Sequence, residues 1–405
     1  MDNEYDLIII GGGPMGLATA WQASHSAQKI LVIDDKRYGH SLSSSVGATR
    51  QFRLQYEEEY MAELVKESQP YWRALSDAVG SELISDSGSL WFGNADSSSS
   101  EGQINAAMKT MDNLGIPYTE LTKEQIEQDY HFTNLGENHI GFFQADGGSI
   151  NIPETLFSLK TLNDASGKVT YLNDSPVLSI TPGNTVTVTT AYASFQASKI
   201  VITAGAKTND LIRSLDTCLD LEIWHMASCY FKKKTPEINY PTWYSFEDQA
   251  DAPEYDPGVY YGFEEVSWNN QGYVRVAPAF AKLITYSMDT QNPAPAPSAE
   301  DIIVTEQFVT KHMLDLNPVA EFQTTGIIAL PAEPTKKMFL DTIPGHDNIV
   351  VYCAGWGAKL IPLIGKICAD LALTGSTEYD ISQFTIDHMP KPYKKSLRTT
   401  RRLPF

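Results

Sequence analysis

The chain has 405 residues, of which 42% are hydrophobic and 20% charged, and its formal net charge is −20. This length and composition are typical of a soluble globular protein with one large core or two smaller ones. The negative charge argues against nucleic acid as a partner, because its phosphates would be repelled. No apolar stretch is long enough to cross a bilayer, and MDNEYDLIII has no basic region before its apolar run. We therefore expect no membrane association, no signal peptide and a cytoplasmic location.

The beginning of the chain reads as a β-α-β unit. YDLIIIGGG predicts a strand that ends in glycines, MGLATAWQAS a helix, and KILVIDD a second buried strand. The GxGxxG motif provides glycines for a tight turn, for a pyrophosphate close to the backbone, and for close packing of helix on strand. The helix N-terminus offers free N–H groups to phosphates, and an acid ends the next strand. A glycine-rich turn with only a structural role is the alternative. The unit predicts dinucleotide binding by Gly11, Gly13, Pro14, Met15, Gly16, Asp34 and Asp35.

Further elements follow in chain order. Apolar residues at helical spacing predict a helix at 57–80, and Pro153 marks the first turn of another at 151–162. Apolar runs predict a buried strand at 199–205 and paired strands at 259–266 and 272–280. A strand and a glycine turn are expected within 348–359, then a helix at 360–373.

Segments of α/β character thus occur at the start, the middle and the end of the chain, with β-rich segments between them. This order predicts an α/β (α+β) protein of two domains, in which a mixed-sheet substrate domain is inserted into a discontinuous Rossmann-like nucleotide-binding domain. We expect the Rossmann-like domain at 1–88, 150–222 and 330–390, the substrate domain at 89–149 and 223–329, and a basic tail at 391–405. The tail is expected to be a solvated segment, with a subunit contact or an acidic partner as the alternatives.

The stretch CAGWGAKLIPLIG indicates which dinucleotide is bound. A second strand, glycine turn and helix after Val351 favours FAD over NAD, because an isoalloxazine ring must be held far from the adenosine. Gly355 and Gly357 would let the backbone approach a flat ring, and the following helix would direct its N-terminus toward the electron-rich edge of that ring.

With these motifs the chain resembles the monomeric sarcosine oxidase and N-methyltryptophan oxidase family, within the D-amino-acid-oxidase-like flavoproteins. The matching stretches include DLIIIGGGPMGLATAWQ, SSSVGATRQFRLQYEEEY, SGSLWFG, KIVITAGA, VYYGF and NIVVYCAGWGAKLIPLIGKICADLALTGSTEYDISQFTI, in the same order over nearly the whole chain. The resemblance implies FAD as cofactor and a substrate domain whose sheet covers the flavin. It also implies oxidation of a C–N bond in an amino acid, often a secondary amine, with the hydride passing to flavin N5.

The resemblance also implies roles for individual residues. Arg53 and Lys359 match the pair that binds the substrate carboxylate, which agrees with the need of a buried carboxylate for cationic partners. An ordinary surface pair is the alternative. Tyr260 falls where an aromatic residue lines the substrate pocket. Residues expected at the flavin, its phosphates or its adenine are Ser44, Thr49, Arg50, Val177, Gly205, Gly355, Trp356, Gly357, Ala358 and Lys359.

Several positions depart from the family pattern. Ala329 stands where close family members attach the flavin through a cysteine, so we expect non-covalent FAD. Arg275 replaces the lysine that activates oxygen; it could still stabilise superoxide, bind an acidic group of the substrate, or face solvent. His225, next to Trp224, is a candidate base or pocket wall, with a structural histidine as the alternative. Val46, Ala48 and Lys207 also differ from the family.

These observations predict an FAD-dependent oxidoreductase acting on a small amino-acid-like molecule, with oxygen or another acceptor taking the electrons. One alternative is a tailoring enzyme for a peptide-, carrier- or protein-bound residue, and another is a flavin-binding subunit of a larger complex. The four cysteines have no metal-ligand spacing, so no metal site is expected.

Overall fold

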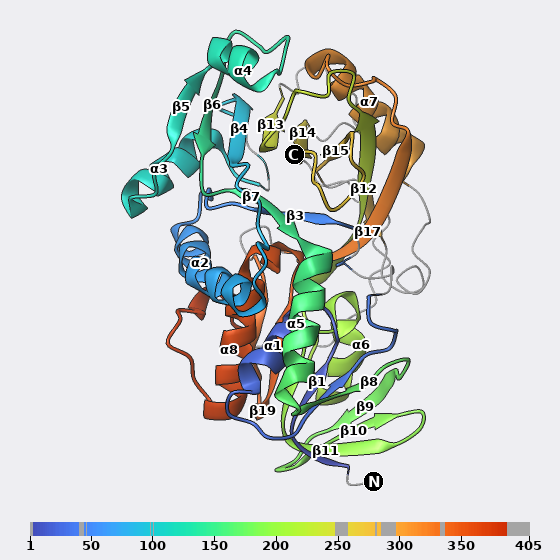
Figure 1. Ribbon diagram of the computed structural model, residues 1–405. Coiled ribbons are helices and arrows are strands. Elements are labelled where there is room, and N and C mark those ends of the chain that lie inside the picture. Colours follow the sequence, from blue (N-terminus) through green and yellow to red (C-terminus); the bar gives the residue numbers. More distant parts are fainter. Residues whose placement is uncertain are drawn as a thin grey trace.

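The structure is a computed structural model, shown in Figure 1. It describes residues 3–39, 44–45, 47–97, 99, 101–247, 258–279, 282–284 (backbone only), 297–332 and 337–386. Val46 and the basic tail at 391–405 lie outside the described residues. Among the helices of the described residues, none combines the length and the apolar character that crossing a bilayer would require.

The first sheet is built on parallel strands from distant parts of the chain. Strand β1 (Glu4–Ile10) pairs with β2 (Ile30–Ile33) and with β11 (Ser194–Ile202), and the sheet continues to β8 (Val169–Leu172) on one side and β19 (His346–Cys353) on the other. Strand β18 (Phe339–Ile343) adds an antiparallel edge, and β9 (Val177–Thr181) and β10 (Val186–Thr190) extend from β11. Strand β2 and the C-terminal parts of β1, β11 and β19 are apolar and buried, because both faces of the sheet are covered there.

Alternate residues of β1 belong to two different cores. Leu7 and Ile9 pack on the side of helices α1 (Pro14–Ala23), α5 (Ile152–Ser166) and α8 (Ile361–Thr374), whereas Ile8 and Ile10 pack on the side of β9 and β10. Helix α1 contacts both α5 and α8, and a side chain at Gly365 of α8 would lie 2.7 Å from the Cβ of Ala18. The predicted β-α-β unit and the predicted C-terminal helix are therefore present, and they pack directly on each other.

The second sheet lies above the first in Figure 1. Its order is β16 (Lys282–Ile284), β12 (Leu221–Lys232), β15 (Tyr273–Pro278), β14 (Val259–Gly262), β13 (Thr242–Phe246), β4 (Ser89–Asn94), β6 (His139–Gln144) and β5 (Thr119–Thr122), and β17 (Phe322–Pro331) also pairs with β12. The expected pairing of 259–266 with 272–280 is confirmed by the antiparallel β14 and β15. This part of the chain also contains α3 (Ile104–Leu114), α4 (Lys123–Tyr130) and α7 (Ala299–His312).

A short ribbon of β3 (Thr49–Phe52) and β7 (Gly148–Asn151) lies between the two sheets (Figure 1). Gln51 of β3 donates from Nε2 to the carbonyls of Trp243 and Gly262, which ties the ribbon to the second sheet. Three predicted domain boundaries, at 149/150, 222/223 and 329/330, fall within β7, β12 and β17. We propose that the domains divide at the ends of these strands, because a boundary inside a strand would divide a continuous ladder.

Candidate active site

The glycine-rich turn after β1 brings the backbone into close contact. Gly11 has φ +110°, and a side chain there would meet the Thr203 carbonyl 2.5 Å away. A side chain at Gly16 would overlap the Gly11 carbonyl, so close packing of α1 on the turn requires glycine. At Gly13 the nearest atom to an added Cβ would be Ser45 Oγ, 3.9 Å away. The absence of any closer contact at Gly13 among the described residues, beside the N-terminus of α1, suits the approach of a phosphate.

The N-cap residue of the same helix has no side chain to cap it. Gly13 caps α1 without a side-chain hydrogen bond, and Pro14 begins the helix. Asp34, directly after β2, accepts hydrogen bonds from the backbone N–H of Gly12 at 2.5 Å and of Lys36 at 2.9 Å. Its carboxylate thus supports the glycine turn, and its expected contact with a ribose stays a prediction.

Two other predicted cofactor positions lie beside this acid. Ser175 N–H donates to the Asp34 carbonyl at 2.9 Å, which brings the segment leading into Val177 alongside the motif. Asp35 forms an ion pair with Lys207. Lys207, one of the departures from the family pattern, therefore places a cation at this end of the proposed cofactor site.

The C-terminal glycine turn lies close to this N-terminal turn. After β19 the chain forms a short 3₁₀ segment, η3 (Gly355–Leu360). A side chain at Gly355 would overlap Ile328 of β17, and one at Gly357 would overlap the Tyr352 hydroxyl and lie 3.0 Å from Met15 Cε. Gly205 also lies near the end of β19, because its carbonyl is 3.4 Å from Cys353 Sγ. Packing within the chain is therefore sufficient reason for Gly355 and Gly357, and their contact with a ring stays a prediction.

A cavity of about 1080 Å³, including its open mouth, lies between the ribbon, the second sheet and η3. Gly355, Trp356, Ala358 and Lys359 form one wall, and β17 contributes residues 324–328 to another. The charged side chains that line it are Arg50, Arg53, Glu101, Arg275 and Lys359, and its aromatic ones are Tyr244, Tyr261, Phe263 and Trp356. The expected carboxylate clamp, Arg53 and Lys359, thus opens onto one cavity.

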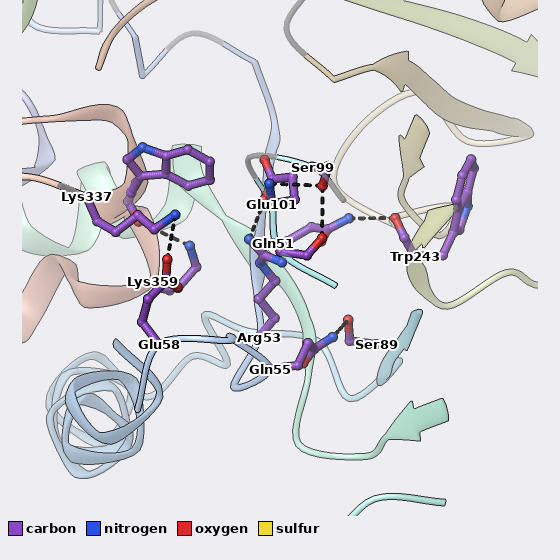
Figure 2. Close-up of polar contacts among 12 residues, drawn as sticks. Gln51, Arg53, Gln55, Glu58, Ser89, Ser99, Glu101, Trp243, Lys337 and Lys359 are labelled. Atoms are coloured by element: carbon purple, nitrogen blue, oxygen red, sulfur yellow. Dashed lines mark hydrogen bonds and ion pairs between the residues drawn. The ribbon is translucent and has the colours of Figure 1, made fainter. Parts of the chain in front are cut away.

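Arg53 follows β3 and is 2% exposed. Its guanidinium carbon lies 4.8, 5.0 and 4.8 Å from the ring centroids of Tyr56, Trp91 and Tyr244. Its Nη2 donates to Glu101 Oε2 at 2.5 Å, as Figure 2 shows, whereas the described residues provide no hydrogen-bond acceptor for the buried Nη1. Burial lowers the pKa of Arg53, but the Glu101 carboxylate and the other neighbours raise it by more, so the net shift of this pKa is upward. Arg53 therefore stays charged and has one buried donor without an acceptor among the described residues.

Lys359 is 6% exposed and enters the cavity from η3. Its Nζ donates to the Trp356 carbonyl at 3.1 Å. Helix α2 (Glu59–Val79) fixes its backbone, because Trp72 Nε1 and Ser68 Oγ donate to the Lys359 carbonyl at 2.6 and 3.1 Å. Burial, and then the neighbouring Arg53, lower the pKa of Lys359 to about 7.

Glu101 is the acid that sequence reasoning missed. It is 8% exposed and stands in a tight turn in which Glu101 N–H donates to Ser99 Oγ at 3.1 Å and Gly102 N–H to the Ser99 carbonyl at 3.1 Å. In the sequence it is one acid in the polar stretch DSSSSEG, which is typical of an exposed loop. Only the tertiary contact with Arg53 distinguishes it from other acids of the chain.

A second cationic pair lies around Thr49. Arg275 of β15 donates from Nη1 to the carbonyl and the Oγ1 of Thr49, both at 3.1 Å, and from Nε to Ser228 Oγ at 2.9 Å. Arg50 donates to the same Thr49 carbonyl at 2.7 Å and to the carbonyl of Ser44. Burial, and then the charge of Arg275, lower the pKa of Arg50 to about 10. Arg275 lines the cavity and is partly buried.

Two residues named as pocket candidates, Tyr260 and His225, do not line this cavity, whereas the next residue of each strand does. Tyr260 of β14 points away from the cavity and stacks on Phe308 at 4.4 Å, whereas Tyr261 lines the cavity. His225 of β12 is buried outside the cavity lining, to which Met226 contributes instead. Successive side chains of a strand point to opposite faces, so an error of one residue moves a side chain to the other face.

These features fit FAD. The α1 N-terminus, where a side chain at Gly13 would meet no described atom closer than 3.9 Å, suits the diphosphate, and the cavity lined by Arg50 and η3 offers hydrogen-bond donors to a ring system. None of the four cysteines lines the cavity; Cys229, Cys353 and Cys368 are buried elsewhere, and Cys218 is partly exposed.

Comparison with known proteins agrees with this interpretation. The family model "FAD dependent oxidoreductase" matches residues 6–371. A putative bifunctional amine oxidase of Dictyostelium discoideum is 30% identical over 407 residues, which are 96% of this chain but only 37% of that protein. The peroxisomal sarcosine oxidase of Homo sapiens is 26% identical over 402 residues, covering 97% of this chain and 98% of that protein.

Among solved structures, NikD, described as an unusual amino acid oxidase essential for nikkomycin biosynthesis, has a TM-score of 0.87 and 33% identity. The match covers 96% of this chain and all of that one. The sequence-based prediction of an FAD-dependent oxidoreductase similar to the sarcosine and amino acid oxidases is thereby confirmed. The chain belongs to the family of FAD-dependent oxidoreductases.

Proposed function

We propose that this enzyme oxidises a C–N bond of a small amino acid or secondary amine that carries a free carboxylate, with FAD as the hydride acceptor. The carrying observation is the buried pair of Arg53 and Lys359 at one cavity. The names of the relatives, sarcosine oxidase and amine oxidase, support the class of reaction. When bound, FAD supplies a hydride acceptor at its ring, and the residues of the cavity supply the placement.

A carboxylate is the group that these cations lack. Nη1 of Arg53 is buried without an acceptor among the described residues, which costs about 1–3 kcal/mol until a ligand provides one. The lowered pKa of Lys359 also indicates a missing anion. A buried ammonium beside a guanidinium is destabilised unless an anion approaches. A substrate carboxylate would accept from both groups. A residue linked in a peptide through its carboxyl group would lack this anion, so we propose a free amino acid as the substrate.

The cavity residues orient the substrate. Arg53 is held by Glu101 and three aromatic rings, and Lys359 is held through its own carbonyl by α2. Hydride transfer from a neutral amine needs little beyond correct placement, so rigid anchors for the carboxylate are the main requirement. Lys359 at the end of η3 would also stabilise negative charge that develops at a nearby ring.

We further propose that FAD is bound non-covalently. The described part of β17 and its continuation, residues 322–332, contains no cysteine, and no cysteine lines the cavity. Acid precipitation of the purified yellow protein tests this point. We expect the colour to remain in the supernatant, whereas a yellow pellet would contradict the proposal.

Arg275 favours a second candidate, a dehydrogenase that passes electrons to an acceptor other than oxygen. It stands where the resemblance expects an oxygen-activating lysine, and its guanidinium is already engaged by Thr49 and Ser228. A planar cation held in this way is a poorer match for superoxide than a mobile ammonium.

One experiment tests both candidates. The purified protein is mixed anaerobically with N-methyl, cyclic and ordinary amino acids, and bleaching of the flavin absorbance is recorded before air is admitted. We expect one class to bleach the flavin. Rapid return of colour in air would identify an oxidase, and slow return a dehydrogenase. No bleaching by any free amino acid would contradict the proposed substrate class.

A further inference from the structure

Glu101 is the one acid among the described residues that line the cavity, and four cations line the same cavity. Its carboxylate contacts Nη2 of Arg53 at 2.5 Å, and the side chains of the two residues are 7% and 2% exposed. The backbone of Glu101 is held by the same turn: Glu101 N–H donates to Ser99 Oγ at 3.1 Å, and Ser99 Oγ donates to the Gly102 carbonyl at 3.1 Å. The carboxylate is thus fixed in the cavity wall and is not a mobile surface group.

The position of Glu101 relative to the clamp is specific. Nη1 and Nη2 of Arg53 are bonded to the same carbon. Glu101 accepts a hydrogen bond from Nη2, whereas Nη1 has no acceptor among the described residues. A substrate carboxylate that accepts from Nη1 and Lys359 would therefore lie beside the Glu101 carboxylate. In an α-amino acid the amine nitrogen is one carbon away from the carboxylate carbon. A substrate held in this way would have its amine nitrogen near the Glu101 carboxylate.

The electrostatics require such a group. An amine with N–H donors, and more so its protonated form, is repelled by a buried guanidinium and ammonium. Arg53 and Lys359 alone would select anions without an adjacent amine. A fixed carboxylate next to them converts the site into one that is complementary to a carboxylate and an amine together.

We infer that Glu101 is the residue that recognises the substrate amine, its carboxylate accepting a hydrogen bond from the substrate N–H while Arg53 and Lys359 hold the carboxylate. This inference rests on the proposed function. It makes Glu101 a specificity-determining residue that favours amino acids with at least one N–H over acids of the same shape without a nitrogen donor.

The opposite role makes a different prediction. If Glu101 merely occupied Arg53 in place of the substrate carboxylate, its removal would strengthen binding of every carboxylate, with or without a nitrogen. If Glu101 accepts from the amine, its removal weakens binding of amines only. Glu101→Gln separates the two roles, because the amide oxygen can still accept from Arg53 while the negative charge is lost.

The ligands are a matched pair, sarcosine and methoxyacetate, in which an ether oxygen replaces N–H. The holoenzyme is used under anaerobic conditions. The Kd of sarcosine is taken from the concentration dependence of flavin bleaching, or from the perturbed flavin spectrum if it does not bleach. The Kd of methoxyacetate is taken from the spectral perturbation. We expect wild type to bind sarcosine more tightly, and Glu101→Gln to raise its Kd at least tenfold while that of methoxyacetate stays constant or falls.

Two variants complete the design. Glu58→Gln is the matched control, since Glu58 pairs with the buried Lys337 at 2.9 Å but does not line the cavity; it should leave the ratio of the two Kd values unchanged. Arg53→Met should weaken both ligands, and failure to do so would overturn the proposed clamp itself. If Glu101→Gln changes the Kd values of both ligands by the same factor while Arg53→Met weakens the binding of both, the role of Glu101 is overturned but the clamp is not. If Glu101→Gln does not fold, equal affinity of wild type for the two ligands also overturns it.

Discussion

Arg53 and Lys359 lie against the same phenol ring: the guanidinium carbon is 4.8 Å and the ammonium nitrogen 5.2 Å from the centroid of Tyr56. These two cations, more than 300 positions apart in the chain, are held near each other in a buried site. Glu101 balances one charge, and the pKa of Lys359 falls to about 7. The site is therefore prepared for one further negative charge.

Replacing either cation by methionine should weaken binding of a carboxylate ligand. For Arg53→Met we expect the Kd of methoxyacetate to rise at least about 30-fold, the lower range for loss of one partner of a buried charge pair. Spectral titration of the flavin measures it. Lys311→Met, which removes an exposed lysine on α7, is the control. Unchanged affinity in the Arg53 variant would refute the clamp.

The affinity for a carboxylate should depend on pH through Lys359. The pKa of this lysine is about 7 without ligand, so the ammonium is charged below pH 7 and neutral above it. An anion binds the charged form, so affinity should fall as pH rises through 7, and binding should take up a proton above pH 7. Titration with propionate, which has no amine to titrate, between pH 6 and pH 9 measures this. Lys359→Met should remove the dependence, and a variant with the wild-type profile would contradict the assignment.

Glu247 should contribute to stability only above acidic pH. It accepts from His312 Nε2 at 3.0 Å and from Ser245 Oγ at 2.6 Å. Despite its burial, these bonds lower the pKa of Glu247 from 4.5 to about 2. Because the folded pKa is depressed, the stabilisation is present above about pH 4.5 and is lost as pH falls toward 2. In urea unfolding, Glu247→Gln should be less stable than wild type at pH 6, with a smaller difference at pH 3. A constant difference would contradict this.

Alanine at Gly355 should destabilise the fold. The added methyl group would overlap Ile328, at a cost of about 1–3 kcal/mol for overpacking. Thermal unfolding measures the loss of stability. Gly355→Ala should cost less stability when it is introduced into the Ile328→Ala variant than when it is introduced into wild type. If the two losses simply add, contact with Ile328 is not the reason for the glycine.

Arg275→Lys should accelerate the reaction of the reduced enzyme with oxygen. Lysine removes the two hydrogen bonds to Thr49 and places a compact ammonium in the same cavity wall. Stopped-flow mixing of the reduced protein with air-saturated buffer measures the rate. Arg275→Met, which removes the charge, should not show the increase. If both variants gain equally, space and not charge limits the reaction.

Local sequence signals predicted the elements that depend on nearby residues. The glycine spacing at Gly11 and Gly16 and the apolar runs of β1, β2 and β19 are short-range patterns, and the structure contains the predicted turn and strands. The family resemblance added Arg53 and Lys359, which do open onto one cavity.

Tertiary structure decided the rest. Whether Tyr260 or Tyr261 enters the cavity depends on strand register, because one residue changes the face. Glu101 belongs to the site only because its turn packs against Arg53, which precedes it by 48 positions. Gly355 has no room for a side chain because Ile328 of β17, a distant part of the chain, packs against it. The sequence by itself thus determined the β-α-β unit with its glycine turn, and the family resemblance added the two cations, Arg53 and Lys359, that line the cavity. Which charges and side chains face them was decided by packing between distant segments, since burial and Coulomb interactions depend on distance in space and not along the chain.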